Sequence, residues 1–376
     1  MKVPLFEPWI SKNDKYRILK SLKSPYLTDG PILRKFESKF SKLVGVDFSI
    51  GVSNGTEALH LSLVSLGIGK GDEVIVPDMT FVATSNAVLL SGATPILADI
   101  DMSLNISPES IKNKITKKTK AIIPVHFAGY SSNMTKIMKI ARQNNLHIIE
   151  DCAHSLGAYF NKKHVGTFGD TGCFSFYPTK NITTIEGGII ITNSKKIAKK
   201  LETLRNHGLT RTLLQRNHDT KPWDYDVVTP GYNFRLDEIR AALGLSQLSR
   251  FKKITMMRKT AAQYYNNKLK NIEGIDIVNY ENEKKHVYHL YIIRIKKSFG
   301  ISRDIVHKKL FQKDIRTTVH YKPLHLFSCF KNYLNKNQKF PNSMNAYNEC
   351  LTLPLFPTIT RKQQDYVIDS ILRLQK

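Results

Sequence analysis

Cysteine is scarce in this chain. The 376 residues contain four cysteines, Cys152, Cys173, Cys329 and Cys350, and none of them forms a CxxC pair or a ligand-like group with histidine. A disulfide framework or a structural zinc site needs such spacing. We therefore expect a reduced, cytoplasmic protein without structural zinc.

Several catalytic signatures are also missing. There is no GxSxG nucleophile elbow, which argues against a serine hydrolase. The glycine-rich run at 67–71 lacks the spacing of a phosphate-binding P-loop, and the glycines in 166–172 do not fit GxGxxG. Asp99 and Asp101 have no nearby histidine, so a loop explains them better than a metal site does. We expect no metal.

Long apolar runs and dense basic blocks are absent as well. Residues 1–8 lack the apolar core of a signal peptide, and no later run approaches the length of a membrane span. The net charge is +26, but the lysines are spread in pairs over the whole chain. A lysine-rich surface explains this better than nucleic-acid binding does, although the positive field would attract a phosphorylated substrate. We expect a soluble protein that binds neither membrane nor nucleic acid.

Short apolar strands alternate with helices in the first part of the chain. The pattern predicts strands at Phe48–Val52, Thr94–Ala98, Ala121–Val125 and His147–Ile149, and a helix at Thr80–Leu90. Such alternation is typical of a mostly parallel sheet that helices cover on both faces. The fold class is therefore α/β.

The pattern changes after about residue 240. One long helix, from Leu236 to Thr260 or beyond, leads to a smaller α/β region with a strand at His289–Arg294. We expect a large domain over residues 1–240 and a small one over 241–376. The N-terminal helix could pack on the small domain.

The most informative stretch surrounds Lys180. An aromatic strand at Phe174–Tyr177 runs into a turn that carries Lys180, and the diglycine Gly187–Gly188 then opens the apolar strand Ile189–Thr192. A lone loop lysine is usually a solvated surface charge. Between two apolar strands, however, an amine can be desolvated and its pKa lowered, which activates it as a nucleophile. We therefore interpret Lys180 as a Schiff-base lysine for pyridoxal phosphate.

Other polar groups follow predicted strands, where ligands bind in open α/β sheets. Residues Ser53–Thr56 open a helix whose N–H groups could hold a phosphate, although ordinary helix capping explains them too. Asp151 could keep a pyridine nitrogen protonated or could be a turn residue. The hydroxyl of Ser175 is a second group that could donate a hydrogen bond to a phosphate. His154 could brace Asp151 or lie near the cofactor ring, and a packed core histidine is an equal alternative.

Together and in this order, these stretches resemble the sugar-nucleotide aminotransferases of the DegT/DnrJ/EryC1/StrS family, which have the type I fold of pyridoxal-phosphate enzymes. The resemblance spans nearly the whole chain. The stretches that carry it are 53–59, 69–75, 77–84, 149–154, 174–188, 230–236, 300–304 and 319–325.

The resemblance implies roles in binding pyridoxal phosphate. Lys180 would hold the cofactor as a Schiff base, and Asp151 would pair with its pyridine nitrogen. Gly55, Thr56 and Ser175 would bind its phosphate.

It also implies a homodimer with active sites at the interface. Phe81 would stack on the cofactor ring and His154 would lie beside it, while Asn233 would reach the phosphate from the other subunit. Arg235, His320 and Tyr321 are expected to contact the sugar or its diphosphate.

The implied reaction moves an amino group from L-glutamate to a ketosugar nucleotide. The form of residues 181–188 looks like that of the C4-aminating branch, which includes the 4-amino-arabinose and pseudaminic-type enzymes, with UDP or dTDP as carrier. Ile185 stands where many relatives have glycine or alanine. A C3-specific aminotransferase and a non-enzymatic regulator of the same fold remain alternatives. Related dehydratases carry histidine in place of Lys180.

Overall fold

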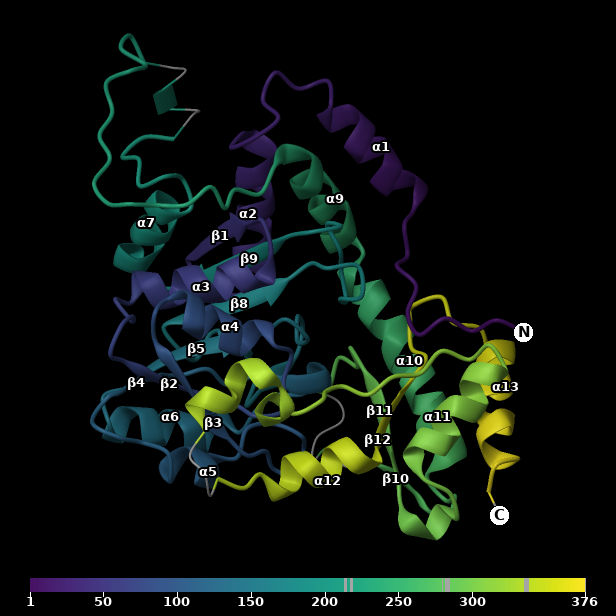
Figure 1. The fold of residues 1–376 in the computed structure, drawn as a ribbon. Helices are drawn as coiled ribbons and strands as arrows, with labels where there is room; N and C mark the ends of the chain where they lie inside the picture. Colours follow the sequence, from purple (N-terminus) through teal and green to yellow (C-terminus); the bar gives the residue numbers. More distant parts are fainter. Residues whose placement is uncertain (213–214, 217–218, 279, 281–284, 335–337, 376) are drawn as a thin grey trace.

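A computed structural model describes residues 1–212, 215–216, 219–278, 280, 285–334 and 338–375 (Figure 1). Its strands are β1 (Phe48–Val52), β2 (Glu73–Pro77), β3 (Thr94–Ala98), β4 (Thr119–Ile122), β5 (His147–Asp151), β6 (Tyr159–Phe160), β7 (Lys163–His164), β8 (Thr171–Ser175), β9 (Gly188–Thr192), β10 (Ile275–Ile277), β11 (Tyr291–Ile295) and β12 (Cys350–Leu353). Its α-helices are α1 (Lys12–Ser21), α2 (Pro31–Val44), α3 (Gly55–Ser65), α4 (Ala83–Leu90), α5 (Pro108–Lys112), α6 (Met134–Gln143), α7 (Lys195–Leu204), α9 (Glu238–Ser249), α10 (Phe251–Leu269), α11 (Arg303–Gln312), α12 (Pro341–Glu349) and α13 (Arg361–Leu372).

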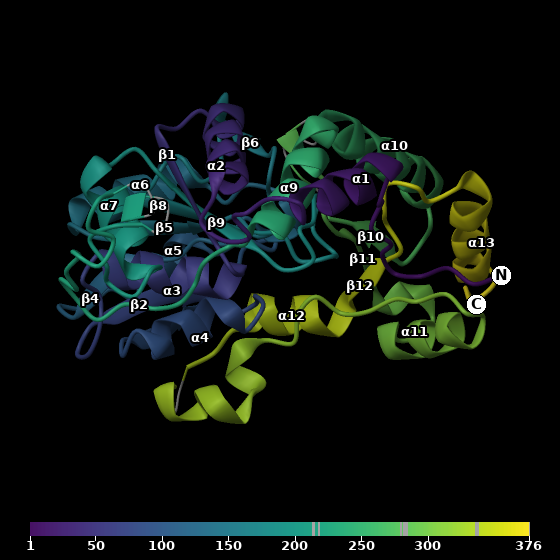
Figure 2. The ribbon, with the colours of Figure 1, turned by 90° about the horizontal axis from the view of Figure 1, so that it is seen from above.

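The large sheet is mostly parallel, as predicted. Its seven strands follow the order β1-β9-β8-β5-β4-β2-β3, and β9 runs antiparallel to both of its neighbours. Alternate residues of each strand enter different cores: Val74 and Val76 pack with α3 and α4, whereas Ile75 packs with α6. Figure 2 shows α3 and α4 on the opposite side of the sheet from α2. The carboxyl ends of β1, β2, β5 and β8 therefore meet at one edge.

A smaller antiparallel sheet, β10-β11-β12, lies beside the large one (Figure 1). Residues of α10, α11 and α13 form its apolar core together with Val3, whose backbone bridges to Ile315. Helix α1 packs against α9. The predicted boundary between residues 240 and 241 falls inside α9, and this division into domains stays a prediction.

Several predicted elements have other bounds in the structure. The strand predicted at Ala121–Val125 is β4, which ends at Ile122, and the strand predicted at Phe174–Tyr177 is β8, which ends at Ser175. The long helix from Leu236 to Thr260 is two helices, broken at Arg250, whose guanidinium lies 4.4 Å from the Trp9 ring. No proline or glycine marks this break in the sequence, and Arg250 contacts the distant N-terminal segment there. The strand predicted at His289–Arg294 is β11, which begins two residues later at Tyr291. The helix predicted at Thr80–Leu90 begins only at Ala83.

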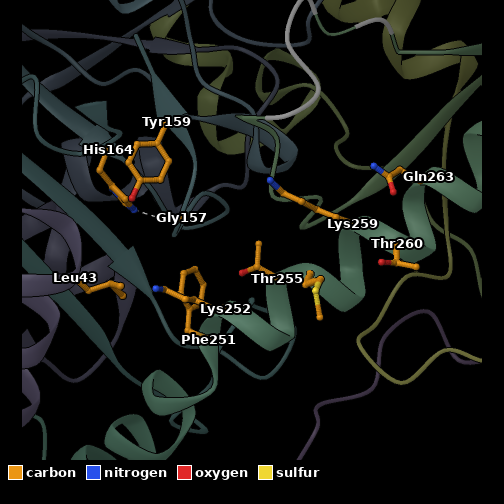
Figure 3. Close-up of a pocket in the computed structure, with 11 residues that line it drawn as sticks. Leu43, Gly157, Tyr159, His164, Phe251, Lys252, Thr255, Lys259, Thr260 and Gln263 are labelled. Atoms are coloured by element: carbon orange, nitrogen blue, oxygen red, sulfur yellow. Dashed lines mark hydrogen bonds between the residues drawn. The ribbon is translucent and has the colours of Figure 1, made fainter. Parts of the chain in front are cut away.

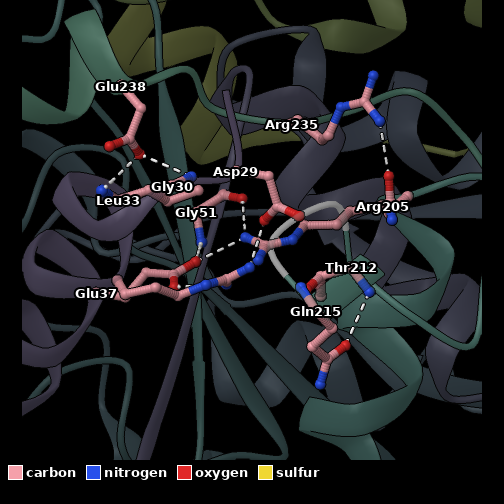
Figure 4. A network of polar contacts seen from close by, with 12 residues as sticks. Asp29, Gly30, Leu33, Glu37, Gly51, Arg205, Thr212, Gln215, Arg235 and Glu238 are labelled. Carbon is pink, nitrogen blue, oxygen red and sulfur yellow. Dashed lines mark hydrogen bonds and ion pairs between the residues drawn. The ribbon is translucent and has the colours of Figure 1, made fainter. Parts of the chain in front are cut away.

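A carboxylate from α9 caps helix α2 (Figure 4). The N-cap of α2 is Gly30, which has no side chain to accept the first N–H groups. Glu238, fully buried, accepts the backbone N–H groups of Gly30, Ile32 and Leu33 at 2.8–3.0 Å. Its negative charge also lies at the positive end of the helix dipole.

A buried ion pair joins α2 to the end of α7 (Figure 4). The Arg205 guanidinium donates to Glu37 and to the carbonyl of Gly51, both at 2.6 Å, and Glu37 accepts the Gly51 N–H at 2.8 Å. Removing either partner would leave an unpaired buried charge. The pair therefore fixes α2 and α7 against the middle of β1.

Two further sequence expectations concern cysteines and membranes. All four cysteines are free, and Cys329 is the exposed one. Among the described residues, no helix combines the length and apolar character that crossing a bilayer requires.

We predict that Glu238→Gln lowers the free energy of unfolding by about 2–3 kcal/mol, because the amide presents fewer acceptors and no charge to three buried N–H groups. Urea unfolding at an unchanged m-value measures the effect. Glu273→Gln is the matched control at an exposed position and should change stability by less than about 0.5 kcal/mol. Equal unfolding midpoints for both variants would contradict the capping role.

Candidate active site

A cavity of about 790 Å³ opens at the carboxyl edge of the large sheet. It brings together most of the predicted site residues. Those that line it are Gly55, Thr56, Phe81, Asp151, His154, Ser175, Lys180, His320 and Tyr321. Asn233 and Arg235 do not line it in this protomer: Asn233 is exposed, and Arg235 donates to the Asn206 side chain at 2.7 Å. The roles of all these residues stay predictions.

The N-terminus of α3 forms one wall. Asn54 is its N-cap and accepts the Glu57 N–H at 2.9 Å, so capping is one of the functions of this motif. A Cβ added to Gly55 would lie 2.8 Å from the Cβ of Ser175, and one added to Gly188 would lie 2.3 Å from the carbonyl oxygen of Asn54. The backbone of this turn therefore fits tightly between β8 and β9, with the first N–H groups of α3 at the cavity.

Asp151 ends β5 and is buried. Its carboxylate accepts the Thr84 hydroxyl at 2.9 Å and the Ala153 N–H at 3.1 Å. Burial raises the pKa of Asp151, and these hydrogen bonds oppose the rise. The result is a carboxylate held in a fixed orientation within a poorly solvated site.

Lys180 lies in the loop between β8 and β9. Two backbone hydrogen bonds close this loop, from Phe176 N–H to Gly187 at 2.8 Å and from Thr184 N–H to Phe176 at 3.0 Å. Burial lowers the pKa of Lys180 to about 8, although the charge of Asp151 acts in the opposite direction. The amine is thus partly neutral near neutral pH, as the sequence predicted for a desolvated lysine.

Aromatic side chains form the remaining wall. The Tyr321 hydroxyl lies 3.3 Å from His154 Nε2, and the ring of Phe81 lies 5.8 Å from that of Tyr321. Burial and the charge of Lys180 hold the pKa of His154 well below its usual value. His154 is therefore a neutral imidazole beside the cavity, and Phe81, which is 54% exposed, lies nearer the solvent.

Ile185 adopts a left-handed conformation, with φ of 72°. A β-branched residue is strained there, at a cost of about 1–2 kcal/mol. Thr183 accepts its N–H at 2.9 Å, and Thr184 bonds to the Glu186 carbonyl at 2.7 Å. The loop thus keeps the shape that glycine would adopt more easily, and Glu186 still lines the cavity.

Sequence reasoning missed several lining residues. Thr84 orients Asp151, and His60 lies below the cavity with its ring 5.1 Å from that of Tyr232. Both are on helices, where their polar side chains resemble ordinary capping or core residues. The one available signal was that Thr84 is the last residue of the 77–84 motif.

A second cavity, of about 510 Å³, lies between α10 and the β6–β7 turn (Figure 3). Lys252 and Thr255 line it, and its His164 accepts the Gly157 N–H at 2.8 Å. No carboxylate lines this cavity. It therefore lacks the acid–amine pair of the first cavity.

The structure also groups His126, Glu150 and Cys152, which the sequence did not suggest. His126 Nε2 lies 2.9 Å from Glu150, and its Nδ1 accepts the Ser132 N–H. Glu150 further accepts backbone N–H groups at 2.7–2.9 Å. Because both nitrogens of His126 and both oxygens of Glu150 form hydrogen bonds, we interpret the group as a structural network.

The first cavity fits pyridoxal phosphate. A helix N-terminus attracts a phosphate, and a buried carboxylate matches a protonated ring nitrogen. The amine of Lys180, with its lowered pKa, lies in the same cavity. The Asn54–Gly55 turn leaves no room for a larger side chain, so a phosphate can approach the backbone closely.

Comparison with known proteins agrees with this site. The family model described as DegT/DnrJ/EryC1/StrS aminotransferase matches residues 8–372. The spore coat polysaccharide biosynthesis protein SpsC of Bacillus subtilis is 35% identical, and the match covers 100% of this chain and 97% of SpsC.

Two solved structures are similar over the whole chain. The putative sugar aminotransferase Spr1654 of Streptococcus pneumoniae, in its PMP-form, has a TM-score of 0.93 and 29% identity, and covers 100% of this chain and 99% of its own. Helicobacter pylori PseC, an aminotransferase of pseudaminic acid biosynthesis, gives the same values. This chain therefore belongs to the DegT/DnrJ/EryC1/StrS aminotransferase family, whose members are pyridoxal-phosphate-dependent sugar transaminases.

Proposed function

We propose that this protein transfers the amino group of L-glutamate to the C4 carbonyl of a nucleotide-linked ketosugar. The substrate would be a UDP- or dTDP-linked 4-keto-6-deoxyhexose or 4-ketopentose, and the product a 4-amino sugar for surface polysaccharide, lipopolysaccharide or glycan synthesis. The observation that carries the proposal is the pairing of buried Asp151 with partly buried Lys180, whose pKa is lowered, in one large cavity. Its volume, about 790 Å³, suits a cofactor together with part of a substrate.

Bound pyridoxal phosphate supplies an electron sink for the transfer of a proton at the carbon that bears the amine. Asp151, fixed by Thr84 and Ala153, would keep the ring nitrogen protonated. Lys180, once released from the cofactor, would act as the general base, because its lowered pKa lies near neutral pH. Gly55, Thr56 and Ser175 would hold the phosphate.

A homodimer would complete the site. Asn233 would reach the cofactor phosphate of the partner, and in its own protomer it is exposed and away from the cavity. The segment between α7 and α9 carries Trp223 and Val228, which expose 72% and 60% of their surface. Such apolar exposure supports a covered interface. The free cysteines support a cytoplasmic location.

The form of residues 181–188 supports C4 amination. Ile185, in place of a glycine or alanine, does not open this turn, because it adopts a left-handed conformation and Thr183 accepts its N–H. PseC, at a TM-score of 0.93, belongs to pseudaminic acid biosynthesis, and we carry this over as support for a related ketosugar. A C3-specific aminotransferase is the alternative within the family. A non-enzymatic regulator would not need the desolvated amine.

We predict that loading of pyridoxal phosphate onto the cofactor-free protein depends on the protonation of Lys180. Only the neutral amine attacks the aldehyde, so the rate should rise about tenfold per pH unit below the pKa and level off above it. The plateau should begin near pH 8, where the pKa lies. In Asp151→Asn the plateau should begin at lower pH, because the carboxylate raises this pKa. Stopped-flow absorbance measures the rate, and a rate that still rises steeply through about pH 10 would show a solvated lysine.

We predict that Lys180→Ala abolishes the visible absorbance of covalently bound cofactor and lowers amino transfer at least about 1,000-fold. Lys162→Ala, at an exposed lysine of the β6–β7 turn, is the control and should keep full activity. Glutamate should convert the holoenzyme to the pyridoxamine form. A wild-type protein that stays colourless with added pyridoxal phosphate would refute the proposed function.

The position of amination is tested with a panel of 4-keto and 3-keto sugars on UDP and dTDP. We expect aminated product from a 4-keto substrate, detected by mass spectrometry. Product from the 3-keto sugars alone would establish the C3 alternative.

A further inference from the structure

A small side cavity of about 60 Å³ adjoins the main cavity. Thr179, His320 and Tyr321 line both of them, so the two are neighbours around the loop of Lys180. The opposite walls come from β11, β12 and the N-terminal segment, where Leu5 accepts the Leu355 N–H at 3.2 Å. The side cavity is thus a recess of the active site that lies under the first residues of the chain.

The recess contains buried polar groups that can bind a ligand. His289, only 5% exposed, lines it, and its Nδ1 has no hydrogen-bond partner within the described residues. His320 places its Nδ1 2.9 Å from the Thr352 hydroxyl, which leaves Nε2 for another contact. A buried polar atom without a partner costs free energy unless a ligand pairs with it.

The charge around the recess favours an anion. Among the residues that the structure describes, no aspartate or glutamate lines it. Behind His289, the buried guanidinium of Arg258 donates to the carbonyls of His289 and Leu355 at 3.4 and 3.2 Å, and no carboxylate of the described residues forms an ion pair with it. The amine of Lys180 lies in the adjoining main cavity, and its charge adds to the effect of burial, which lowers the pKa of His289 and His320. An anion in the recess would therefore meet positive charge from two directions.

Size and apolar surface narrow the choice of anion. About 10–15 Å³ is enough for one water, so this recess holds a group of a few non-hydrogen atoms and not a sugar ring or a diphosphate. Leu5, Leu290 and Leu353 supply an apolar wall that suits methylene groups. A carboxylate on a short aliphatic chain matches both the polar groups and the apolar wall of the recess.

We propose that the recess binds a carboxylate of the amino-acid donor. This inference rests on the proposed transaminase function and moves His320 from a contact with the sugar nucleotide to a contact with the donor. His289 and Thr179 bind the carboxylate, and Arg258 is a positioning residue that acts through His289. The sugar nucleotide occupies the wider main cavity.

The first measurement is the binding of glutarate, a dicarboxylate without an amine, to the holoenzyme by calorimetry. The second is how the loss of the cofactor's visible absorbance depends on the concentration of glutamate. We expect Thr179→Val and His289→Phe each to weaken glutarate about tenfold or more, because each removes a hydrogen bond to a charged group. The affinity for UDP or dTDP should change less than about twofold. Thr255→Val, which makes the same change in the separate cavity of Figure 3, is the matched control and should leave both affinities unchanged.

The outcomes separate this inference from the proposed function. If the wild-type enzyme reacts with glutamate but both variants bind glutarate with the same affinity as the wild-type enzyme, the recess does not bind the donor. Weaker binding of the nucleotide alone would return these residues to the sugar side and overturn the inference. A wild-type enzyme that neither binds glutarate nor reacts with glutamate would overturn both. Should His289→Phe fail to fold, Thr179→Val decides, because Thr179 is partly exposed.

Discussion

The close approach of Gly188 to the Asn54–Gly55 turn is the constraint on which the site depends. Gly188 is paired with Val52 of β1 and with Ser175 of β8, and a Cβ at this position would lie 2.3 Å from the Asn54 carbonyl oxygen. Backbone therefore packs directly against backbone where three strands and one helix meet. This packing sets the distance between the N-terminus of α3 and the loop of Lys180. One ligand can then place its phosphate at the N-terminus of α3 and react with the amine of Lys180 on the loop.

The electrostatics of the site follow from the same burial. Asp151 is buried and Lys180 is partly buried, so burial shifts the pKa of both groups, and the charge of each opposes the shift of the other. The imidazoles of His154, His289 and His320 stay neutral, because burial lowers the pKa of each and the charge of Lys180 acts in the same direction. The cavity therefore combines one amine, of Lys180, with the carboxylates of Glu57, Asp151 and Glu186 and with neutral imidazoles.

Local pattern was sufficient for much of the fold. β1 and β3 have the predicted bounds, because short apolar runs between turn residues leave few alternatives. Family membership and the type I fold are confirmed, and the cavity unites residues that the sequence places at strand ends. What local pattern could not supply was long-range contact. Glu238 caps a helix at Gly30, which is 208 residues away in the chain, and Arg250, at the break between α9 and α10, contacts Trp9 of the N-terminal segment. His289 likewise has no motif, and only the packing of β11 beside the loop of Lys180 brings it into the site.

Ile185 shows how such contacts override local preference. A β-branched residue favours an extended backbone, yet Ile185 adopts a φ of 72° directly after two threonines whose hydroxyls form hydrogen bonds within the turn. The cost of this conformation is distributed over a loop that is fixed at both ends, by β8 and by Gly188. Because the loop is fixed at both ends, the strain of Ile185 is retained beside Lys180. The side chain of Ile185 is 58% exposed, so the hydrogen bonds of the two threonines, and not burial of this side chain, stabilise the turn.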